Sequence, residues 1–186
     1  MTARVRANAA VPHYDTATIR PLPEPRMTDR PDPPPYPPLR PFAPTLGGHR
    51  WEGVAHRPYK EDGRELFRDI SRQTLFSRPD LAGELRYFEV ALGGYSTLER
   101  HQHVHAVLIL RGAGSALVGD EVLILAQNDL VTVPPMIWHQ FRAASDAPLG
   151  FLCMVDALRD KPQVPTPEEL AALRSNPAIA RFLGPA

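Results

Sequence analysis

The sequence predicts an all-β protein whose strands form an antiparallel sandwich or barrel. From residue 84 onward, short aliphatic and aromatic runs alternate with turn residues about every 8–12 positions, a spacing typical of antiparallel strands rather than of βαβ units. Twelve of the 22 prolines lie ahead of this region, in residues 1–46. Four of the seven histidines lie inside it, between residues 101 and 139. The chain therefore divides into a proline-rich start and a strand-rich body.

Residues 1–48 are predicted to be a disordered or extended arm. Proline lacks the backbone N–H and fixes φ, so the run from Pro31 to Pro38 favours polyproline II over helix or central strand. Few apolar residues accompany the prolines, and the segment cannot bury enough surface to offset the entropy of ordering. The arm could also lie over the domain or a neighbouring subunit, or bind a proline-recognition module.

Residues 49–84 are expected to be strands and loops that lead into the barrel. The stretch 65–70 is consistent with a short helical turn, and 73–76 with a short strand. The barrel itself is assigned to residues 85–157. Its predicted strands are 85–92, 103–110, 115–118, 121–125, 130–133, 138–142 and 151–155. Gly93-Gly94 is expected to end the first of them, and Gly119-Asp120 indicates a hairpin.

The tail, residues 158–186, is predicted to be helical. Thr166, Pro167 and Glu169 supply a cap residue, a proline at the first helical position and the glutamate of a capping box. Asn176-Pro177 starts a second short turn that runs through Phe182. We expect these helices to close one end of the barrel, and a homodimer through them is an option.

Composition excludes several classes of protein. Lys plus Arg and Asp plus Glu are both 21, and this zero net charge argues against a nucleic-acid partner. No apolar run approaches the roughly 18–20 residues of a membrane helix, and the start has no apolar secretory segment. Cys153 is the only cysteine, which excludes a disulfide framework and a zinc ribbon and fits a cytoplasmic location. It is interpreted as a small buried hydrophobe.

A cluster of metal-competent residues is the central functional feature. Glu99, His101, His103 and His105 alternate along the chain, so in a strand they would share one face. Burying four such groups without a partner would cost several kcal/mol. A further histidine, His139, lies in another predicted strand. A bound metal ion explains both observations, whereas a solvated edge strand explains only the alternation.

The spacing around this cluster resembles the first motif of the cupin superfamily, G-x5-H-x-H-x3,4-E-x6-G. Gly93, Glu99, His101, His105 and Gly112 follow that spacing throughout. Two ligand identities are exchanged, because Glu99 stands at the first histidine position and His105 at the glutamate position.

The second cupin motif, G-x5-P-x-G-x2-H-x3-N, is matched at Pro134 and His139. Asn128, Met136 and Ala143 replace its other positions. The resemblance covers roughly residues 85–157.

A competing register places His101 and His103 on the H-x-H pair. It then puts Val107 at the glutamate position and Tyr95 at the leading glycine, so two motif positions are lost. The first register is preferred, with Glu99, His101, His105 and His139 as metal ligands. In it His103 is an inward neighbour that orients a ligand or carries a proton. His101 and His139 are ligands in both registers.

The resemblance implies an antiparallel double-stranded β-helix (a jelly-roll barrel) that holds one divalent metal ion per chain. Three imidazoles and one carboxylate suit Fe(II), our first choice, and also Mn, Ni, Cu, Co or Zn. Two open coordination positions would accept a small polar substrate, or a substrate atom and O₂. The function expected from the resemblance is a dioxygenase-type enzyme. The alternatives are a cupin isomerase or lyase and a non-catalytic small-molecule-binding or sensor protein.

Overall fold

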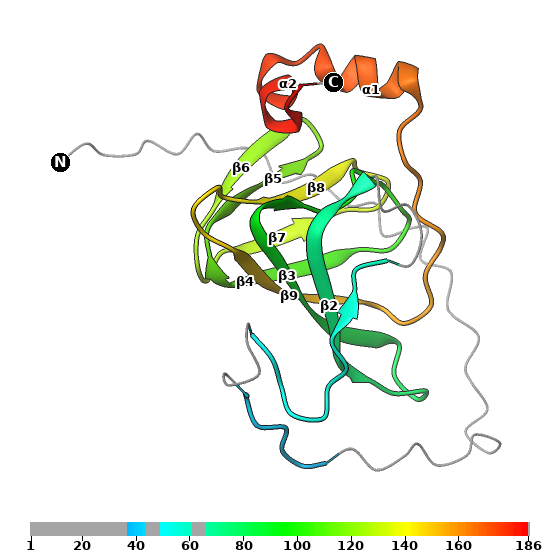
Figure 1. Cartoon of the computed structure of the whole chain (residues 1–186). Coiled ribbons are helices and arrows are strands. Elements are labelled where there is room, and N and C mark those ends of the chain that lie inside the picture. Colours follow the sequence, from blue (N-terminus) through cyan, green and yellow to red (C-terminus); the bar gives the residue numbers. More distant parts are fainter. Residues whose placement is uncertain (1–36, 44–48, 61–65, 186) are drawn as a thin grey trace, which may run out of the picture. The chain divides into compact units, whose positions relative to one another are not determined.

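The computed structural model describes residues 37–43, 49–60 and 66–185, all within one compact unit, Pro33–Ala186. Most of the predicted arm therefore lies outside the described residues. Within the described part, nine strands and two short helices follow one another (Figure 1). This confirms the prediction of an all-β fold with short C-terminal helices. None of the described helices is long and apolar enough to cross a membrane.

The strands form one curled antiparallel sheet. Its main path runs β6-β5-β8-β3-β9-β4-β7, with β2 also paired to β3 and β1 to β2. The strand bounds are β1 Arg57–Pro58, β2 Arg68–Ser77, β3 Gly83–Tyr95, β4 His105–Gly112, β5 Gly114–Val118, β6 Glu121–Leu125, β7 Leu130–Val133, β8 His139–Ala143 and β9 Leu149–Asp156.

Strand β3 joins the parts of the sheet because it continues through Gly93-Gly94, where the sequence predicted its end. Its first half pairs with β9, whereas Tyr95 at its far end pairs with Arg142 of β8. Gly93 has φ +65°, and a Cβ on Gly94 would lie 2.6 Å from the Arg68 carbonyl oxygen. The two glycines therefore bend the strand between partners instead of ending it.

Residues 68–70 were expected in a helical turn, and this is wrong because Arg68 begins β2. Residue 65 lies outside the described residues. Ile70 pairs with Val90 across the β2–β3 ladder and is buried in the core. Asp69 has φ 50° at a register shift, so a bulge accommodates the mixed pattern that resembled a turn. The strand expected at 73–76 is confirmed within β2.

The inner faces of the strands enclose one apolar core, built from residues of all the long strands. Its largest members are Phe88, Phe141 and Phe151, and Cys153 lies among them at 2% exposure. Cys153 thus packs as the small buried hydrophobe that was predicted. The predicted β5–β6 hairpin is confirmed, with Val118 opposite Glu121 and Gly119 at φ 67°.

Two helices follow the last strand, α1 at Pro167–Arg174 and α2 at Pro177–Leu183. The predicted capping box is present, since Thr166 and Glu169 exchange side-chain-to-backbone hydrogen bonds. Ile179 and Leu183 of α2 pack on Leu98 and Leu117 in a second apolar cluster, apart from the main core. The helices therefore cover one end of the strands (Figure 1).

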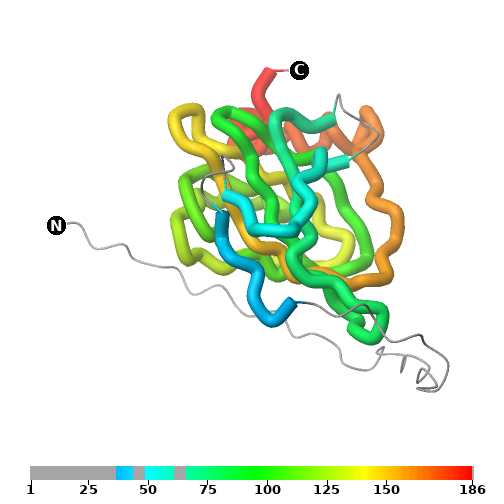
Figure 2. The backbone as a smooth tube through the Cα atoms, turned by 60° about the horizontal axis from the view of Figure 1, so that its bottom comes forward, coloured from blue at the N-terminus to red at the C-terminus, as the bar shows by residue number. Residues whose placement is uncertain are grey.

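Residues 49–60 run across the face of the barrel (Figure 2). His49 stacks on Tyr87 with ring centroids 5.3 Å apart, and Phe42 pairs with Trp51 through an isolated bridge. At the end of this segment, Tyr59 packs against Phe88 of the core. This crossing brings residues far from the barrel in sequence to the edge of its interior.

Candidate metal centre

Three histidines converge inside the barrel. One ring nitrogen from each of His101, His105 and His139 lies within 4.8 Å of the others. His105 is the first residue of β4 and His139 the first of β8, while His101 lies in the loop before β4. His101 and His139 are almost fully buried. Three nitrogen donors at this separation can share one metal ion.

The backbone brings these residues together by a different route from the predicted one. Residues 99–105 do not form one strand, because the chain bends at Gln102 and His103 and β4 begins only at His105. Glu99 instead forms an isolated bridge with His139, with N–H···O distances of 3.1 and 2.9 Å. This bridge places the start of β8 beside the histidine-rich loop.

Hydrogen bonds to carbonyl oxygens orient two of the imidazoles. Nδ1 of His101 donates to the His103 carbonyl oxygen at 2.9 Å, and Nδ1 of His139 donates to that of Ile137, also at 2.9 Å. Each ring is thereby held in the tautomer that leaves a lone pair on Nε2. Within the described part of the chain, Nε2 of both His101 and His105 is buried without a hydrogen-bond partner. A buried imidazole nitrogen with a free lone pair can bind a metal ion, so these residues fit a metal site.

The three imidazoles are held neutral. Burial, and then the nearby His139, lowers the pKa of His105 to about 2 and that of His101 to about 4. Burial also lowers the pKa of His139. Neutral imidazole is the form that binds a metal, so these rings need no deprotonation near neutral pH.

His103 lies against this group but outside it. Its ring stacks on His101 with centroids 3.6 Å apart, and its Nδ1 lies 2.7 Å from Oδ1 of Asp160. Slight burial opposes ionisation of Asp160, but hydrogen bonds from the Gln102 N–H and from His103 lower its pKa to about 2. The ionised carboxylate thus holds His103 in one orientation.

Glu99 is buried beside the three histidines, and its carboxylate is engaged elsewhere. It forms an ion pair with Lys60, and Tyr59 donates a hydrogen bond to its other oxygen at 3.3 Å. Lys60 also lies 3.3 Å from Oγ1 of Thr97. Of the four residues expected as ligands, the structure therefore brings three together and pairs the fourth with a lysine.

Tyr59 and Lys60 were not predicted from the sequence. They lie 40 and 39 residues from Glu99, in a segment without strand or helix periodicity, so no local signal marks them. Burial, followed by the charge of Glu99, raises the pKa of Tyr59 well above its usual value. The phenol therefore stays protonated and acts as a hydrogen-bond donor. Together the buried Glu99, the partly exposed Lys60 and Tyr59 form an acid–base group next to the histidines.

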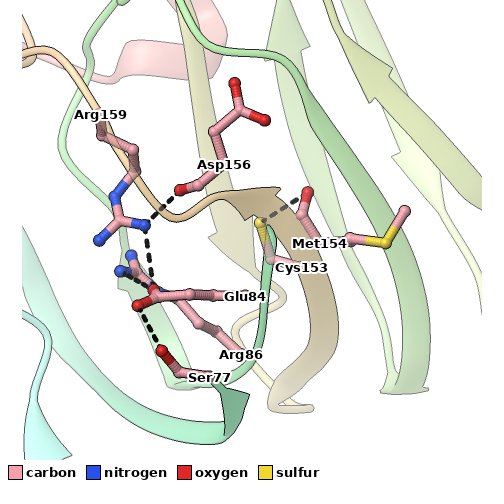
Figure 3. A network of polar contacts seen from close by, with 7 residues as sticks. All are labelled: Ser77, Glu84, Arg86, Cys153, Met154, Asp156 and Arg159. Atoms are coloured by element: carbon pink, nitrogen blue, oxygen red, sulfur yellow. Dashed lines mark hydrogen bonds and ion pairs between the residues drawn. The ribbon is translucent and has the colours of Figure 1, made fainter. Parts of the chain in front are cut away.

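A second polar group lies farther along the barrel interior. Ser77, Arg86 and Arg159 all bond to the carboxylate of Glu84 (Figure 3). Cys153 is close by, and burial raises its pKa to about 12, so the thiol is protonated and weakly reactive.

Comparisons with known proteins place the chain in a family. The cupin domain family model matches residues 86–155. A protein named 1-methylthio-D-xylulose 5-phosphate methylsulfurylase, from Rhodospirillum rubrum, is 58% identical over 144 residues, which cover 77% of this chain and 92% of that protein.

Solved structures agree with this placement. A cupin-2 domain from Rhodospirillum rubrum is 56% identical, with TM-score 0.70, over 79% of this chain and 97% of that one. A cupin 2 conserved barrel domain protein from Rhodopseudomonas palustris is 57% identical, with TM-score 0.71, over 77% and 97% of the two chains. The predicted cupin barrel is thereby confirmed, and the chain belongs to the cupin superfamily.

Proposed function

We propose that this chain is a metal-dependent enzyme that acts on a small phosphorylated sugar carrying a methylthio group. The observation that supports this most strongly is the 58% identity to the methylsulfurylase over 92% of that protein's length. The relative's name specifies a ketopentose with a phosphate at one end and a methylthio group at the other. A buried cluster of metal donors beside an acid–base group suits such a substrate.

His101, His105 and His139 would hold the metal ion, and Glu99 would be a fourth ligand only after releasing Lys60. Three imidazoles suit Fe(II), our first choice, as well as Mn, Ni, Cu, Co or Zn. When bound, the ion would supply Lewis-acid chemistry to carbonyl and hydroxyl oxygens of the substrate.

The protein's own residues would move protons at the carbon chain. Glu99 is the base of the acid–base group, Lys60 is its proton donor, and Tyr59 donates a hydrogen bond to an oxygen of the substrate or of Glu99. His103, whose Nδ1 is bonded to Asp160, presents Nε2 as a further proton acceptor. Glu99 and His103 are buried, whereas Lys60 is partly exposed, and burial of the base limits competing reactions with water.

The test is direct. The metal-loaded chain is incubated with 1-methylthio-D-xylulose 5-phosphate, with and without a thiol reductant, and the S-methyl signal of the sugar is followed by NMR. We expect that signal to be lost with wild-type protein and retained with His139→Ala. A wild-type preparation with one metal per chain that leaves the sugar unchanged under both conditions would contradict the proposal.

A dioxygenase-type reaction with Fe(II) is a second proposal, supported by the three neutral imidazoles on a cupin barrel. Oxygen uptake by the anaerobically iron-loaded chain on addition of substrate would favour it over the first. Absence of turnover together with tight ligand binding would favour a non-catalytic binding or sensor role. Isomerisation or elimination would show as a new sugar phosphate without oxygen uptake.

The partner is proposed to be a small molecule rather than a nucleic acid or a membrane, in keeping with the zero net charge. A cytoplasmic location is proposed because the single cysteine is free and buried. A homodimer is also proposed. The exposed apolar side chains on the outer surface of β4, β7 and β9, at Leu108, Leu130 and Met154, suit a second copy, and sedimentation analysis tests this.

A further inference from the structure

Charged residues occupy one stretch of the barrel's inner face. In β3, Phe88 and Val90 face the core, so by the two-residue period of a strand Glu84 and Arg86 face the same interior. The Arg86 side chain is only 13% exposed. A charge at this depth is costly unless it is paired or binds a ligand of opposite charge.

One carboxylate serves two guanidinium groups there. Arg86 donates from Nε to Oε2 of Glu84 at 2.8 Å, and Arg159, which follows β9, donates to the same oxygen at 3.0 Å. Figure 3 shows both side chains directed at Glu84 with the carboxylate of Asp156 pointing away from it. The Ser77 hydroxyl donates a hydrogen bond to the other carboxylate oxygen, Oε1, at 3.0 Å. Glu84 therefore balances only one of the two positive charges.

Two more arginines extend the positive surface along β2 and β1. Arg57 and Arg72 are directly opposite each other, and Arg72 shares the inward face of β2 with buried Ile70. Burial and the charges of Arg86, Arg159 and Arg57 lower the pKa of Arg72. Within residues 37–43, 49–60 and 66–185, Arg72 makes no hydrogen bond and no close ion pair. Among the charges that act on Arg72, three are guanidinium groups and one is the carboxylate of Glu84, so positive charge is in excess.

This group lies within reach of the three histidines. Along the β3–β9–β4 ladder, Glu84 pairs with Val155, and Val155 pairs with His105. Neighbouring strands are about 4.8 Å apart, so the backbones at Glu84 and His105 are roughly 10 Å apart, with both side chains directed inward. An extended five-carbon sugar phosphate could reach from one group to the other.

We infer that Arg72, Arg86 and Arg159 form a phosphate-binding subsite that anchors the phosphorylated end of the substrate while its other end lies at the three histidines. Guanidinium groups match phosphate oxygens with paired, charge-assisted hydrogen bonds, and they remain charged when partly buried. Glu84 holds two of the three in place before the ligand arrives. This inference rests on the proposed function, because it assigns a place to the phosphate of that substrate.

Arg72→Gln is the informative variant. Arg72 makes no close ion pair, so its loss leaves no buried carboxylate without a partner, and we expect the variant to fold like wild type. Binding of D-xylulose 5-phosphate, D-xylulose and inorganic phosphate to the full metal-loaded chain is measured by isothermal titration. Arg181→Gln, on the exposed face of α2, removes one positive charge elsewhere and is the matched control. Arg72→Lys keeps the positive charge but removes the planar guanidinium group, so it separates the two contributions.

We expect Arg72→Gln to bind D-xylulose 5-phosphate about 10- to 100-fold more weakly than wild type, the loss typical of one charge-assisted hydrogen bond. Arg72→Lys should lose less, and Arg181→Gln should stay within about twofold of wild type. Inorganic phosphate should compete with the sugar phosphate in wild type. The inference would be overturned if Arg72→Gln bound D-xylulose 5-phosphate as tightly as wild type does. It would also be overturned if wild type bound D-xylulose and D-xylulose 5-phosphate with equal affinity.

Turnover of the methylthio sugar phosphate by the same preparations separates the two proposals. If the proposed function fails and the subsite is real, turnover is absent while phosphate binding still depends on Arg72. If the subsite is wrong and the function is real, wild type turns the substrate over and Arg72→Gln does so with an unchanged KM.

Discussion

The carbonyl oxygen of His103 lies 2.9 Å from Nδ1 of His101, so the backbone of one histidine orients the imidazole of its neighbour. The side chain of His103 has a separate partner in Asp160. A residue that resembles a ligand in the sequence thus contributes its main chain to the metal group. His105, two positions later, contributes its ring.

This division of roles predicts a contrast between two alanine variants. His103→Ala keeps the carbonyl that orients His101, so it should retain at least half of the wild-type metal content. His105→Ala removes a donor and should weaken metal binding by about 10- to 100-fold or more. Metal content after anaerobic purification and dialysis measures both. Metal loss confined to His103→Ala would instead support the competing register.

The ion pair between Lys60 and Glu99 should stabilise the metal-free protein. Lys60→Met leaves a buried carboxylate without its cation, and we expect a loss of about 1–2 kcal/mol in the free energy of unfolding, less than for a fully buried pair because Lys60 is partly exposed. Urea denaturation of the metal-free protein measures it. Lys161→Met, at an exposed position, should change stability by less than about 0.5 kcal/mol.

The double variant Lys60→Met/Glu99→Gln is the control for the unpaired carboxylate of Glu99. Removing the carboxylate together with the lysine should recover part of the lost stability, since no unpaired charge remains. A double variant as unstable as the sum of the two single variants would show that the pair is not coupled.

The depressed pKa values predict how the stability of the metal-free protein depends on pH. His101 and His105 have pKa values of about 4 and about 2, below the usual 6.5 of an unfolded chain. The unfolded state therefore binds more protons than the folded state below pH 6.5. Stability from these neutral rings is complete above pH 6.5 and declines as pH falls toward 4, by up to about 1.4 kcal/mol per pH unit for each ring.

Urea denaturation between pH 7.5 and pH 4.5 measures this slope. We expect His105→Gln to show a smaller slope than wild type, since one of the buried histidines with a lowered pKa is gone. A wild-type stability that does not change between pH 7 and pH 5 would contradict the assigned protonation states.

Much of the barrel was predictable because its signals are local. Gly119-Asp120 fixes a hairpin through turn chemistry, and the Thr166–Glu169 capping box fixes a helix start. Gly93-Gly94 was misread because the same conformational freedom that ends a strand also lets a strand bend and change partners.

The convergence of the histidines was predicted correctly, but the backbone arrangement that was expected to produce it was wrong. Alternation placed residues 99–105 on one strand, whereas the bridge between Glu99 and His139 and the bend at His103 create the convergence. The partners of Glu99 could not be predicted, since Tyr59 and Lys60 reach it only through the segment that crosses the barrel. Contacts of this kind follow from tertiary packing, which no local pattern encodes.

Metal content of the untagged protein tests the central claim most directly. Wild type, His139→Ala and His56→Ala are purified anaerobically and analysed by mass spectrometry for Mn, Fe, Co, Ni, Cu and Zn, with His56→Ala as the control because that histidine lies outside the cluster. We predict about one metal ion per chain in wild type and in His56→Ala, and little in His139→Ala. Full metal content in His139→Ala, with native circular dichroism, would contradict the account.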